Sequence, residues 1–438
     1  MKKLLQFKLR INLLAFLFVI SNLAYAQTWD VYSSSMSMGR DVVYTSDSCI
    51  VATGTPSNSN AGISMKIDLN GNLIWTKPHG GFSLCETFDK GFIIAGALNY
   101  SNARLRKLDS NGNLLWDSIY GGPAQSELMS VIQASDSGIV ACGFNMNYGD
   151  STFYVLKTDK NGNYLWQQNI YTVGHGSARE IIELNNNYYI IGSSGSYPNK
   201  MITFVRLDAN GAVTLRKDIP IGYTAQAFAQ FNENSFVVCG QNSVSKISLS
   251  GDTIWHKQFN GQMFNFQSID VTGNSNIIIS GSQGYMVVND DYEHNMMLLL
   301  NGNGAIVWSE TFPVSGDHTP QSLESVISLS NTDFVGCGYA TINDTIRMRV
   351  IQYHNITSNI SNNYAVDKPI VIYPNPTTGK VMIDIDGLKK VWVLNGEGKL
   401  ILETNKKPEI DLSAFPKGIY FLKVFTEEGI YTEKIILQ

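Results

Sequence analysis

The sequence predicts an all-β protein in which a seven-bladed β-propeller is followed by a small C-terminal β-sandwich. Three observations support this fold class. A phrase that begins "DLNGNLIW" at Asp68 returns as "DSNGNLLW" at Asp109 and as "DKNGNYLW" at Asp159. An apolar run that ends in Gly recurs with a similar period. Val, Ile, Tyr, Phe and Trp fill the runs between breaks rich in Asp, Asn and Gly, and helical periodicity is absent.

Residues 1–26 precede the predicted fold. "MKKLLQFKLR" is basic, "INLLAFLFVISNL" is apolar but short, and "AYA" places small residues before Gln27. This pattern predicts a secretory signal peptide with cleavage after Ala26, and an uncleaved anchor is the alternative. The residue directly after the cleavage site is Gln27 and not Cys, which argues against a lipoprotein. No later run holds about 18 apolar residues, so we expect no membrane span in the mature chain.

Charge and cysteine content argue against several classes of protein. There are 32 Lys and Arg against 37 Asp and Glu, and the net charge of −5 disfavours nucleic acid and anionic lipid as main partners. Five Cys in an exported chain argue against a complete disulfide framework. Cys142, Cys239 and Cys337 each precede a Gly in an apolar run, so we expect them to be buried as small hydrophobic side chains.

Two landmarks define the repeat. The slot four residues after each turn glycine holds Trp75, Trp116, Trp166, Leu215, Trp255 and Trp308, and Trp29 stands without its turn near the mature N-terminus. The apolar runs end at Gly54, Gly96, Gly143, Gly192, Gly240, Gly281 and Gly338. Each landmark occurs seven times, and successive Trp slots lie 40 to 53 residues apart. Such a period, with several strands per unit, is typical of a propeller or a solenoid. We expect each unit to be a four-stranded antiparallel sheet.

The repeated phrase predicts a hairpin turn followed by an aromatic wedge. Asp and Asn favour turns, and Gly adopts positive φ without a Cβ clash. If residues 69–71 form the loop, Met65 faces Trp75 across the hairpin. The Trp then fills the gap between neighbouring sheets, a burial that contributes roughly 2–3 kcal/mol.

The alternative for the same phrase is a calcium loop, because D-x-N-G-N resembles the start of an EF-hand. Such a loop needs a carboxylate at its twelfth position. His79, Tyr120 and Ile170 stand there instead. A structural turn is therefore the favoured interpretation.

The two ends of the repeat region complement each other. The last unit supplies three strands, "SVISLS", "DFVGCGYA" and "TIRMRVIQYH", and stops without a Trp strand. The mature N-terminus, "QTWDVYS", is a Trp strand without its unit. Pairing the two ends would close a ring over residues 27–355 and remove the exposed sheet edge. Six or eight blades are the alternatives to seven. "LDxNGNxxW" followed by "YGG" resembles the repeats of quinoprotein-like and WD-type propellers, over one turn and one strand per blade.

The C-terminal part departs from the repeat. Residues 356–369 are rich in Asn and Ser and are predicted to be a linker. Residues 370–438 alternate short strands with Pro, Gly and Asn turns, which suggests a small β-sandwich. "YPNPTTGK", "DLSAFPKGIYFLKV" and the terminal "EKIILQ" resemble the type A C-terminal sorting domain of the type IX secretion system of Bacteroidetes. The alternative is that these motifs are ordinary turn and strand elements.

By that resemblance, one set of positions carries the sorting signature: Pro374, Asn375, Pro376, Gly379, Gly418, Tyr420 and Lys434. The resemblance implies Sec export to the periplasm and contact between residues 370–438 and the type IX machinery. It also implies delivery to the medium or the outer-membrane cell surface.

The sequence predicts no catalytic, metal-binding or cofactor-binding residue and no cofactor, since the local motifs of such sites do not occur. The loops after the Trp strands form the candidate ligand face, with His79, Glu127, His175, Arg179, His318 and Glu324. A basic row precedes the turns at Lys66, Lys107, Lys157, Arg206 and Lys246. We expect this row on the sheet face opposite the Trp, in a structural or solvated role.

The predicted function is that of an exported binding module whose partner is an unknown surface glycan or protein. A secreted enzyme that acts on glycans or uses a quinone cofactor is the alternative, and a purely structural surface component is the third. The sequence does not distinguish between these three by any local motif.

Overall fold

The computed structural model describes residues 27–354 and 371–438 apart from short internal segments. Those segments are 57–61, 99–101, 122–124, 148–149, 173, 197–198, 221–223, 260–262, 288–289, 313–320, 344, 386, 396–399 and 427–429. The predicted signal peptide and linker lie outside the described residues. All regular elements of the described chain are strands, so the all-β class is confirmed.

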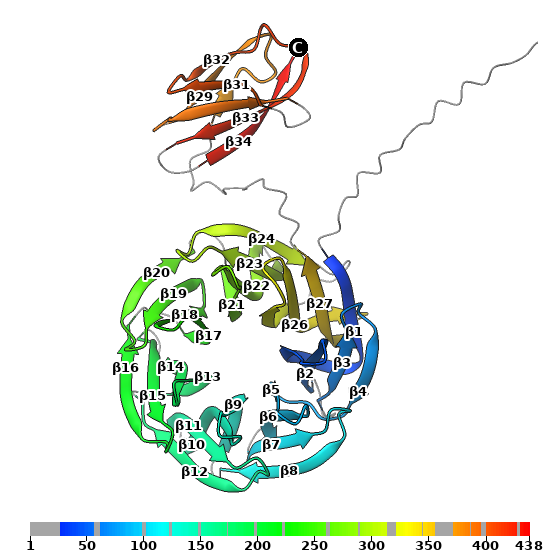
Figure 1. Cartoon of the computed structure of the whole chain (residues 1–438), viewed down its shortest axis with the longest axis vertical. Coiled ribbons are helices and arrows are strands. Elements are labelled where there is room, and N and C mark those ends of the chain that lie inside the picture. Colours follow the sequence, from blue (N-terminus) through cyan, green and yellow to red (C-terminus); the bar gives the residue numbers. More distant parts are fainter. Residues whose placement is uncertain are drawn as a thin grey trace, which may run out of the picture.

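The strands of the first region are arranged around a ring (Figure 1). Five of its sheets are four-stranded, with strands in sequence order from the centre outwards. They are β5–β8 (Ser83–Glu86, Phe92–Leu98, Asn102–Leu108, Leu114–Tyr120), β9–β12 (Gln125–Gln133, Ile139–Asn147, Asp150–Thr158, Tyr164–Ile170), β13–β16 (Ser177–Leu184, Asn187–Ser194, Met201–Asp208, Val213–Ile219), β17–β20 (Ala225–Asn232, Ser235–Gly240, Ser243–Ser248, Thr253–Gln258) and β21–β24 (Met263–Val271, Ile277–Val287, Asp290–Leu300, Ile306–Phe312).

The sixth sheet of this region is seven-stranded, because the long strand β1 (Gln27–Tyr44) belongs to two groups of strands. Residues 27–36 of β1 pair with β27 (Thr345–His354), beyond which lie β26 (Asp333–Ile342) and β25 (Ser322–Ser328). Residues 37–44 pair instead with β2 (Cys49–Pro56), followed by β3 (Ser64–Asp68) and β4 (Leu73–Lys77). The two ends of the repeat region are thus hydrogen-bonded neighbours.

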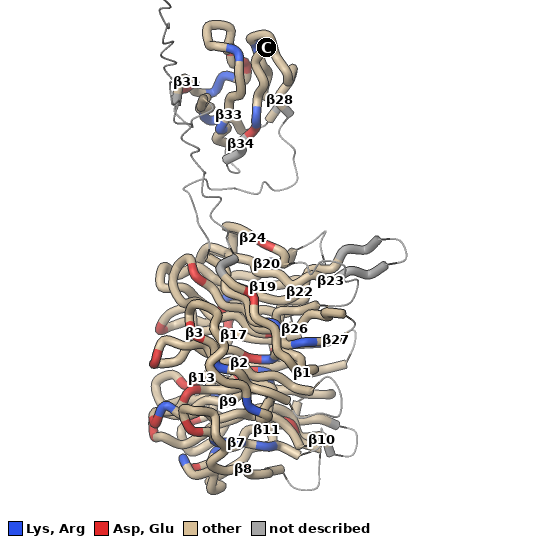
Figure 2. The backbone as a smooth tube through the Cα atoms, turned by 90° about the vertical axis from the view of Figure 1, so that its right-hand side faces the viewer, with Lys and Arg blue, Asp and Glu red and all other residues tan. Residues whose placement is uncertain are grey.

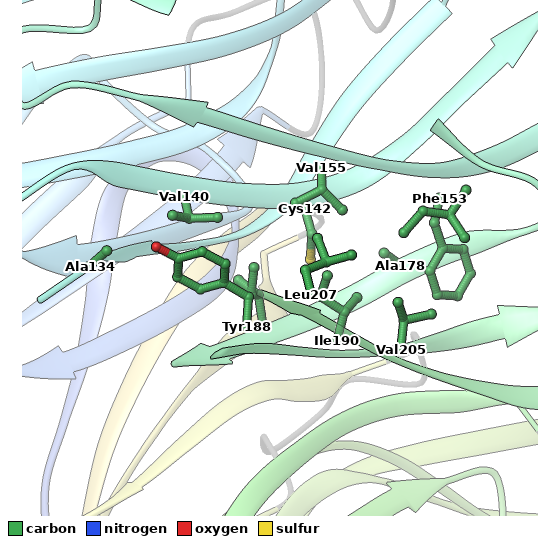
Figure 3. Packing of buried hydrophobic residues seen from close by; sticks show 12 residues of the cluster. Ala134, Val140, Cys142, Phe153, Val155, Ala178, Tyr188, Ile190, Val205 and Leu207 are labelled. Carbon is green, nitrogen blue, oxygen red and sulfur yellow. The ribbon is translucent and has the colours of Figure 1, made fainter. Parts of the chain in front are cut away.

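The core of this region lies between neighbouring sheets. In the cluster of Figure 3, Cys142 and Phe153 from the β9–β12 sheet face Tyr188 and Val205 from the β13–β16 sheet, and all four are buried. All five Cys are free thiols, and Cys142, Cys239 and Cys337 are fully packed, as expected of small hydrophobic side chains.

The repeated phrase forms a tight turn that its own side chains hold. Oδ1 of Asp68 accepts hydrogen bonds from the backbone N–H groups of Asn70 and Asn72 at 2.9 and 2.8 Å, and Oδ2 accepts one from the Asn72 side chain at 2.9 Å. Asp109 and Asp159 make the same contacts. These bonds lower the pKa of Asp68. Both carboxylate oxygens of the turn Asp therefore accept hydrogen bonds from amide groups of the same turn.

The Trp of one unit packs against the turn glycine of the next. A Cβ added to Gly71, whose φ is +83°, would lie 2.8 Å from the Trp29 ring, and one added to Gly162 would lie 3.1 Å from Trp116. Trp29 also donates a hydrogen bond from Nε1 to the Leu69 carbonyl at 3.0 Å. Glycine is thus needed at these turns both for its backbone conformation and for room.

The predicted hairpin register is wrong by one residue beyond the turn. Ile67 pairs with Leu73 as expected, but a β-bulge follows, so that Trp75 lies opposite Lys66 and Met65 lies opposite Thr76. The bulge inserts one unpaired residue into the outer strand, and simple counting from the turn does not include it.

The basic row was expected on the sheet face opposite the Trp side chains, but it lies on the same face as they do. Lys66 and Trp75 both contact the ring of Phe92 on the neighbouring sheet. Three buried members of the row form ion pairs with an Asp of the first turn of their own sheet: Lys66–Asp47 at 2.6 Å, Lys107–Asp89 at 2.7 Å and Lys157–Asp136 at 2.5 Å. These three lysines therefore have a structural role, because each ties a strand to a turn of its own sheet.

The C-terminal unit consists of two sheets around one core. One sheet is β28 (Val371–Tyr373), β29 (Lys380–Asp384) and β32 (Glu409–Asp411), and the other is β31 (Leu400–Asn405), β30 (Lys390–Leu394), β33 (Gly418–Phe425) and β34 (Ile430–Leu437). Their shared core holds Val381, Val391, Leu422 and Ile435, as in a small sandwich.

Candidate binding site in the central channel

The innermost strand of six units carries a β-bulge at the same place. In β13 the pairing passes from Ala178 to Glu180, so that Arg179 has no partner on β14. The residues left out in the same way on the other inner strands are Arg40, Met129, Gln226, Gln267 and Glu324. A bulge re-aims the side chain of its extra residue. All six of these residues line the central channel.

The recurrent strand-end glycine makes room for this bulge. A Cβ on Gly143 would lie 1.9 Å from the carbonyl oxygen of Glu127, and one on Gly192 would lie 2.2 Å from that of Ser177. Gly96 is the exception, because its nearest neighbour would be 3.4 Å away and Phe82 simply precedes β5 without a bulge. In these units the landmark glycine thus positions a channel residue, whose type is not the same in all of them.

We call these seven positions the channel ring: Arg40, Phe82, Met129, Arg179, Gln226, Gln267 and Glu324. Together with the following residues of each inner strand, the ring lines a cavity of about 700 Å³. The seven copies of the repeat thus contribute five types of side chain, Arg, Phe, Met, Gln and Glu, to one site.

The two ring arginines differ in how their charge is compensated. Arg40 donates from Nη1 to Glu324 at 3.1 Å and from Nε to the Thr55 hydroxyl at 3.0 Å. The Nε of Arg179 is buried and has no hydrogen-bond partner among the described residues. Burial lowers the pKa of Arg179, while Glu324 and Glu127 act on it only through longer-range attraction.

The residues that directly follow the channel ring on the inner strands form hydrogen bonds between neighbouring strands. We call this set of bonds the belt. Glu180 accepts a bond from the backbone N–H of Phe228 at 2.7 Å, and Asp41 accepts one from that of Leu84 at 2.9 Å. Ser83, Ser130 and Ser268 act in the same way toward the next strand. Ser325 donates to Asp41 at 2.9 Å and so links β25 to β1. The belt ties the sheets together around the channel.

Burial raises the pKa values of the belt carboxyls. For Glu180 the pKa rises to about 8, mainly through burial, and Asp41 and Asp270 add repulsion. The pKa of Asp41 and that of Asp270 are also raised by burial, against the hydrogen bonds that each carboxyl accepts. The charge of the channel wall therefore depends on pH near neutrality.

A second cavity of about 450 Å³ adjoins the ring at Arg179 and Gln226. It is lined by β13, β14 and the connections that precede β13 and β15, including His175, Ser177 and Lys200. Since antiparallel strands alternate in direction, these connections lie on the opposite face of the ring from the Asp-rich turns. We call the two sides the loop face and the turn face.

Charged residues stand on both faces. The turn face carries Asp47, Asp68, Asp89, Asp109 and Asp136 on consecutive units, and the side view in Figure 2 shows acidic residues along that edge of the ring. Three of these Asp are paired with the buried lysines of the basic row. His175 and Lys200 lie exposed on the loop face, beside the opening near Arg179.

The structure brings together only part of the predicted ligand face. Arg179 and Glu324 belong to the channel ring, His175 lines the adjoining cavity, and Glu127 lies close enough to Arg179 to affect its pKa. His79 lies outside both cavities, on the connection between β4 and β5. Burial and then Arg106 lower the pKa of His79. His318 lies outside the described residues.

Sequence reasoning did not select the ring residues Arg40, Gln226 and Gln267. A signal for them exists, because each stands fourteen residues before a landmark glycine: Arg40 before Gly54, Gln226 before Gly240 and Gln267 before Gly281. For Arg179 and Gly192 the interval is thirteen. This interval between ring residue and landmark glycine can be interpreted only when the position of the bulge is known.

Several sorting-signature residues make contacts that hold the C-terminal unit together. Asn375 donates to the Lys434 carbonyl at 2.7 Å and accepts from the backbone N–H of Ile436 at 3.0 Å. Tyr420 donates from its hydroxyl to the Pro416 carbonyl. A Cβ on Gly379 would lie 2.2 Å from the Ser413 hydroxyl. The first motif thus closes onto the chain's last strand.

Comparisons with known proteins agree with this division. Residues 371–438 match the family of secretion system C-terminal sorting domains. No curated protein sequence matches the chain. No helix of the described chain is long and apolar enough to cross a membrane.

Several solved structures are distantly similar. PorZ, a surface component of the type IX secretion system of Porphyromonas gingivalis, is 13% identical with a TM-score of 0.43 over 90% of this chain, which spans 58% of that structure. A Bacteroides caccae protein of unknown function is 13% identical with a TM-score of 0.42, covering 65% of this chain and 97% of its own. The Pan2 WD40 domain of Neurospora crassa is 11% identical with a TM-score of 0.47, covering 74% and 94%.

The resemblance of the C-terminal motifs to the sorting domain is confirmed by the family match. The domain implies interaction with the type IX machinery. The chain thus joins a propeller-like domain to a secretion system C-terminal sorting domain, which directs its export to the cell surface or the medium.

Proposed function

We propose that the chain is an exported binding protein: a closed seven-bladed propeller that binds a surface macromolecule through its central channel and loop face. The observation that carries the proposal is the channel ring. The landmark glycine recurs in every unit and in six of them makes room for a bulge that aims a side chain into the channel, and the aimed side chains are of four types, Arg, Met, Gln and Glu. A repeated scaffold with variable side chains at one site is typical of recognition surfaces.

Two contacts support the closure of the ring. β1 pairs with β27 through residues far apart in sequence, such as Val31 with Val350. The Arg40–Glu324 ion pair and the Ser325–Asp41 bond join the same two units at the channel. Counting residues 37–44 of β1 with β2–β4 as one unit and residues 27–36 with β25–β27 as another gives seven units.

The test is a glycan array combined with purified candidate surface proteins. We expect Gln267→Trp, which fills part of the channel, to abolish binding of the wild-type ligand. Ile74→Trp places the same side chain on the exposed strand β4 and serves as the matched control. Equal binding by the wild type and Gln267→Trp would overturn the channel as the binding site, and no binding to any surface polymer or protein would overturn the function.

A secreted enzyme stays the second candidate because the channel contains carboxyls. With a pKa raised to about 8, Glu180 holds a proton at neutral pH, as a general acid must. Its Oε2 nevertheless accepts the Phe228 N–H, and both oxygens of Asp41 accept hydrogen bonds. These bonds favour a role in the belt. Release of reducing ends from a bound glycan, lost in Glu180→Gln, would favour the enzyme instead.

A further inference from the structure

The cavity beside Arg179 has one chemical character. Three basic side chains line it, His175, Arg179 and Lys200, together with Ser and Thr hydroxyls, glycine backbone and the amide of Gln226. Among the described residues, no acidic and no large apolar side chain contributes to its wall. Such a lining suits a ligand that is both negatively charged and rich in hydroxyl groups.

Arg179 gives the cavity an unfilled hydrogen-bonding capacity. A guanidinium carries five N–H donors, and leaving a buried donor without a partner costs free energy. Arg40, in the equivalent position three units away, is satisfied by Glu324 and Thr55. Arg179 forms no ion pair or hydrogen bond with any described residue, and its Nε is buried. An anionic ligand group would supply the missing acceptor in the geometry that guanidinium prefers.

The charge at the cavity opening points to the same kind of ligand. Lys200 and His175 lie exposed on the loop face at the cavity mouth, and the opening leads past Arg179 into the channel. An anionic chain at this opening meets the Lys200 ammonium first and the Arg179 guanidinium behind it.

Resting on the proposed function, we propose that the junction around Arg179 binds the acidic group of an anionic polysaccharide, a carboxylate or a sulfate ester. Arg179 binds the acid group, Lys200 and His175 lie at the mouth, and the hydroxyls and Gln226 bind sugar hydroxyls. An acidic peptide is disfavoured, because its apolar side chains would find no matching surface on this wall.

The experiment measures binding of the purified full chain to three short oligosaccharides by calorimetry. The probes are an oligogalacturonate, its carboxyl-reduced neutral counterpart and a sulfated form of that neutral counterpart. We expect one acidic probe to bind, and Arg179→Gln to weaken it at least about 10-fold. Lys200→Gln is expected to weaken it about 3-fold, since its side chain is exposed and its interaction is screened. Arg206→Gln removes the same charge from β15, outside both cavities, and should leave binding unchanged.

The possible outcomes test the site, the charge of the ligand and its chemical class separately. Unchanged affinity in both Arg179→Gln and Lys200→Gln would overturn the site. Equal affinity for the neutral probe would overturn the anionic class but leave the binding function intact. Polyglutamate serves as a fourth, peptide probe, and its binding in place of any oligosaccharide would overturn the choice of a glycan. If none of these probes binds while the glycan array still finds a channel ligand, only the inference about Arg179 fails.

Discussion

The outer rim and the central channel of the ring use the same repeat in opposite ways. At the rim the copies agree: a Trp from one unit meets a turn glycine of the next at Gly71, Gly112, Gly162, Gly211 and Gly304. At the channel the copies share only the backbone, and the ring side chains run from Arg to Phe to Glu. Uniformity therefore builds the scaffold, and variation is confined to the place where a ligand would bind.

The largest expected effect tests whether the landmark glycine really makes the channel. Gly143→Ala places a Cβ against the Glu127 carbonyl and should destabilise the fold by at least about 3 kcal/mol, because the bulge must open. Gly96→Ala is the matched control, since it has room and no bulge opposite, and should cost less than about 1 kcal/mol. Urea unfolding followed by Trp fluorescence measures both, and equal losses would contradict the role assigned to the bulge.

A smaller effect tests the rim. Trp116→Leu removes the ring that packs on Gly162 and should lower the free energy of unfolding by about 1–3 kcal/mol. The converse change, Leu215→Trp, should not stabilise the protein. Phe204 already lies 2.9 Å from where a Cβ of Gly251 would stand, so an added indole would be overpacked. A gain in stability from Leu215→Trp would contradict this expectation and show that the β13–β16 unit has room for a Trp at this slot.

A third effect concerns the channel wall and its dependence on pH. The pKa of Glu180 in the fold, about 8, lies above the ordinary 4.5, so folding favours the protonated form. Its contribution to stability is complete below pH 4.5 and is lost as pH rises through 8. Glu180→Gln keeps an acceptor for Phe228 but cannot ionise, so the free energy of unfolding should fall less in the variant than in the wild type between pH 5 and 9.

Urea unfolding at the two pH values measures that difference. Glu233→Gln, on the exposed turn between β17 and β18, is the control and should follow the wild type. Parallel pH profiles for the wild type and Glu180→Gln would contradict the burial of the Glu180 carboxyl in the belt.

Much of the fold follows from local patterns. Strand-forming runs, the D-x-N-G turn and the sorting motifs are each written within a dozen or so residues, and all of them appear where the sequence placed them. The register beyond the turn does not follow, because the bulge at Lys66/Ile67 adds an unpaired residue to the outer strand that no local motif announces. The same holds for the candidate site: Arg179 and Glu324 were found through their loops, whereas Arg40, Gln226 and Gln267 were not.

By itself the sequence determined the all-β class, the repeat, its turns and the route of export, because these depend on local propensity and on motifs contiguous in the chain. Only the tertiary structure decided which side chains share the channel, since strands some 40 residues apart come together there through pairing and bulges. It also decided that Arg40 is neutralised by Glu324 while Arg179 is not. Pairing of β1 with β27 brings Glu324 beside Arg40, whereas the ring neighbours of Arg179 are the uncharged Met129 and Gln226.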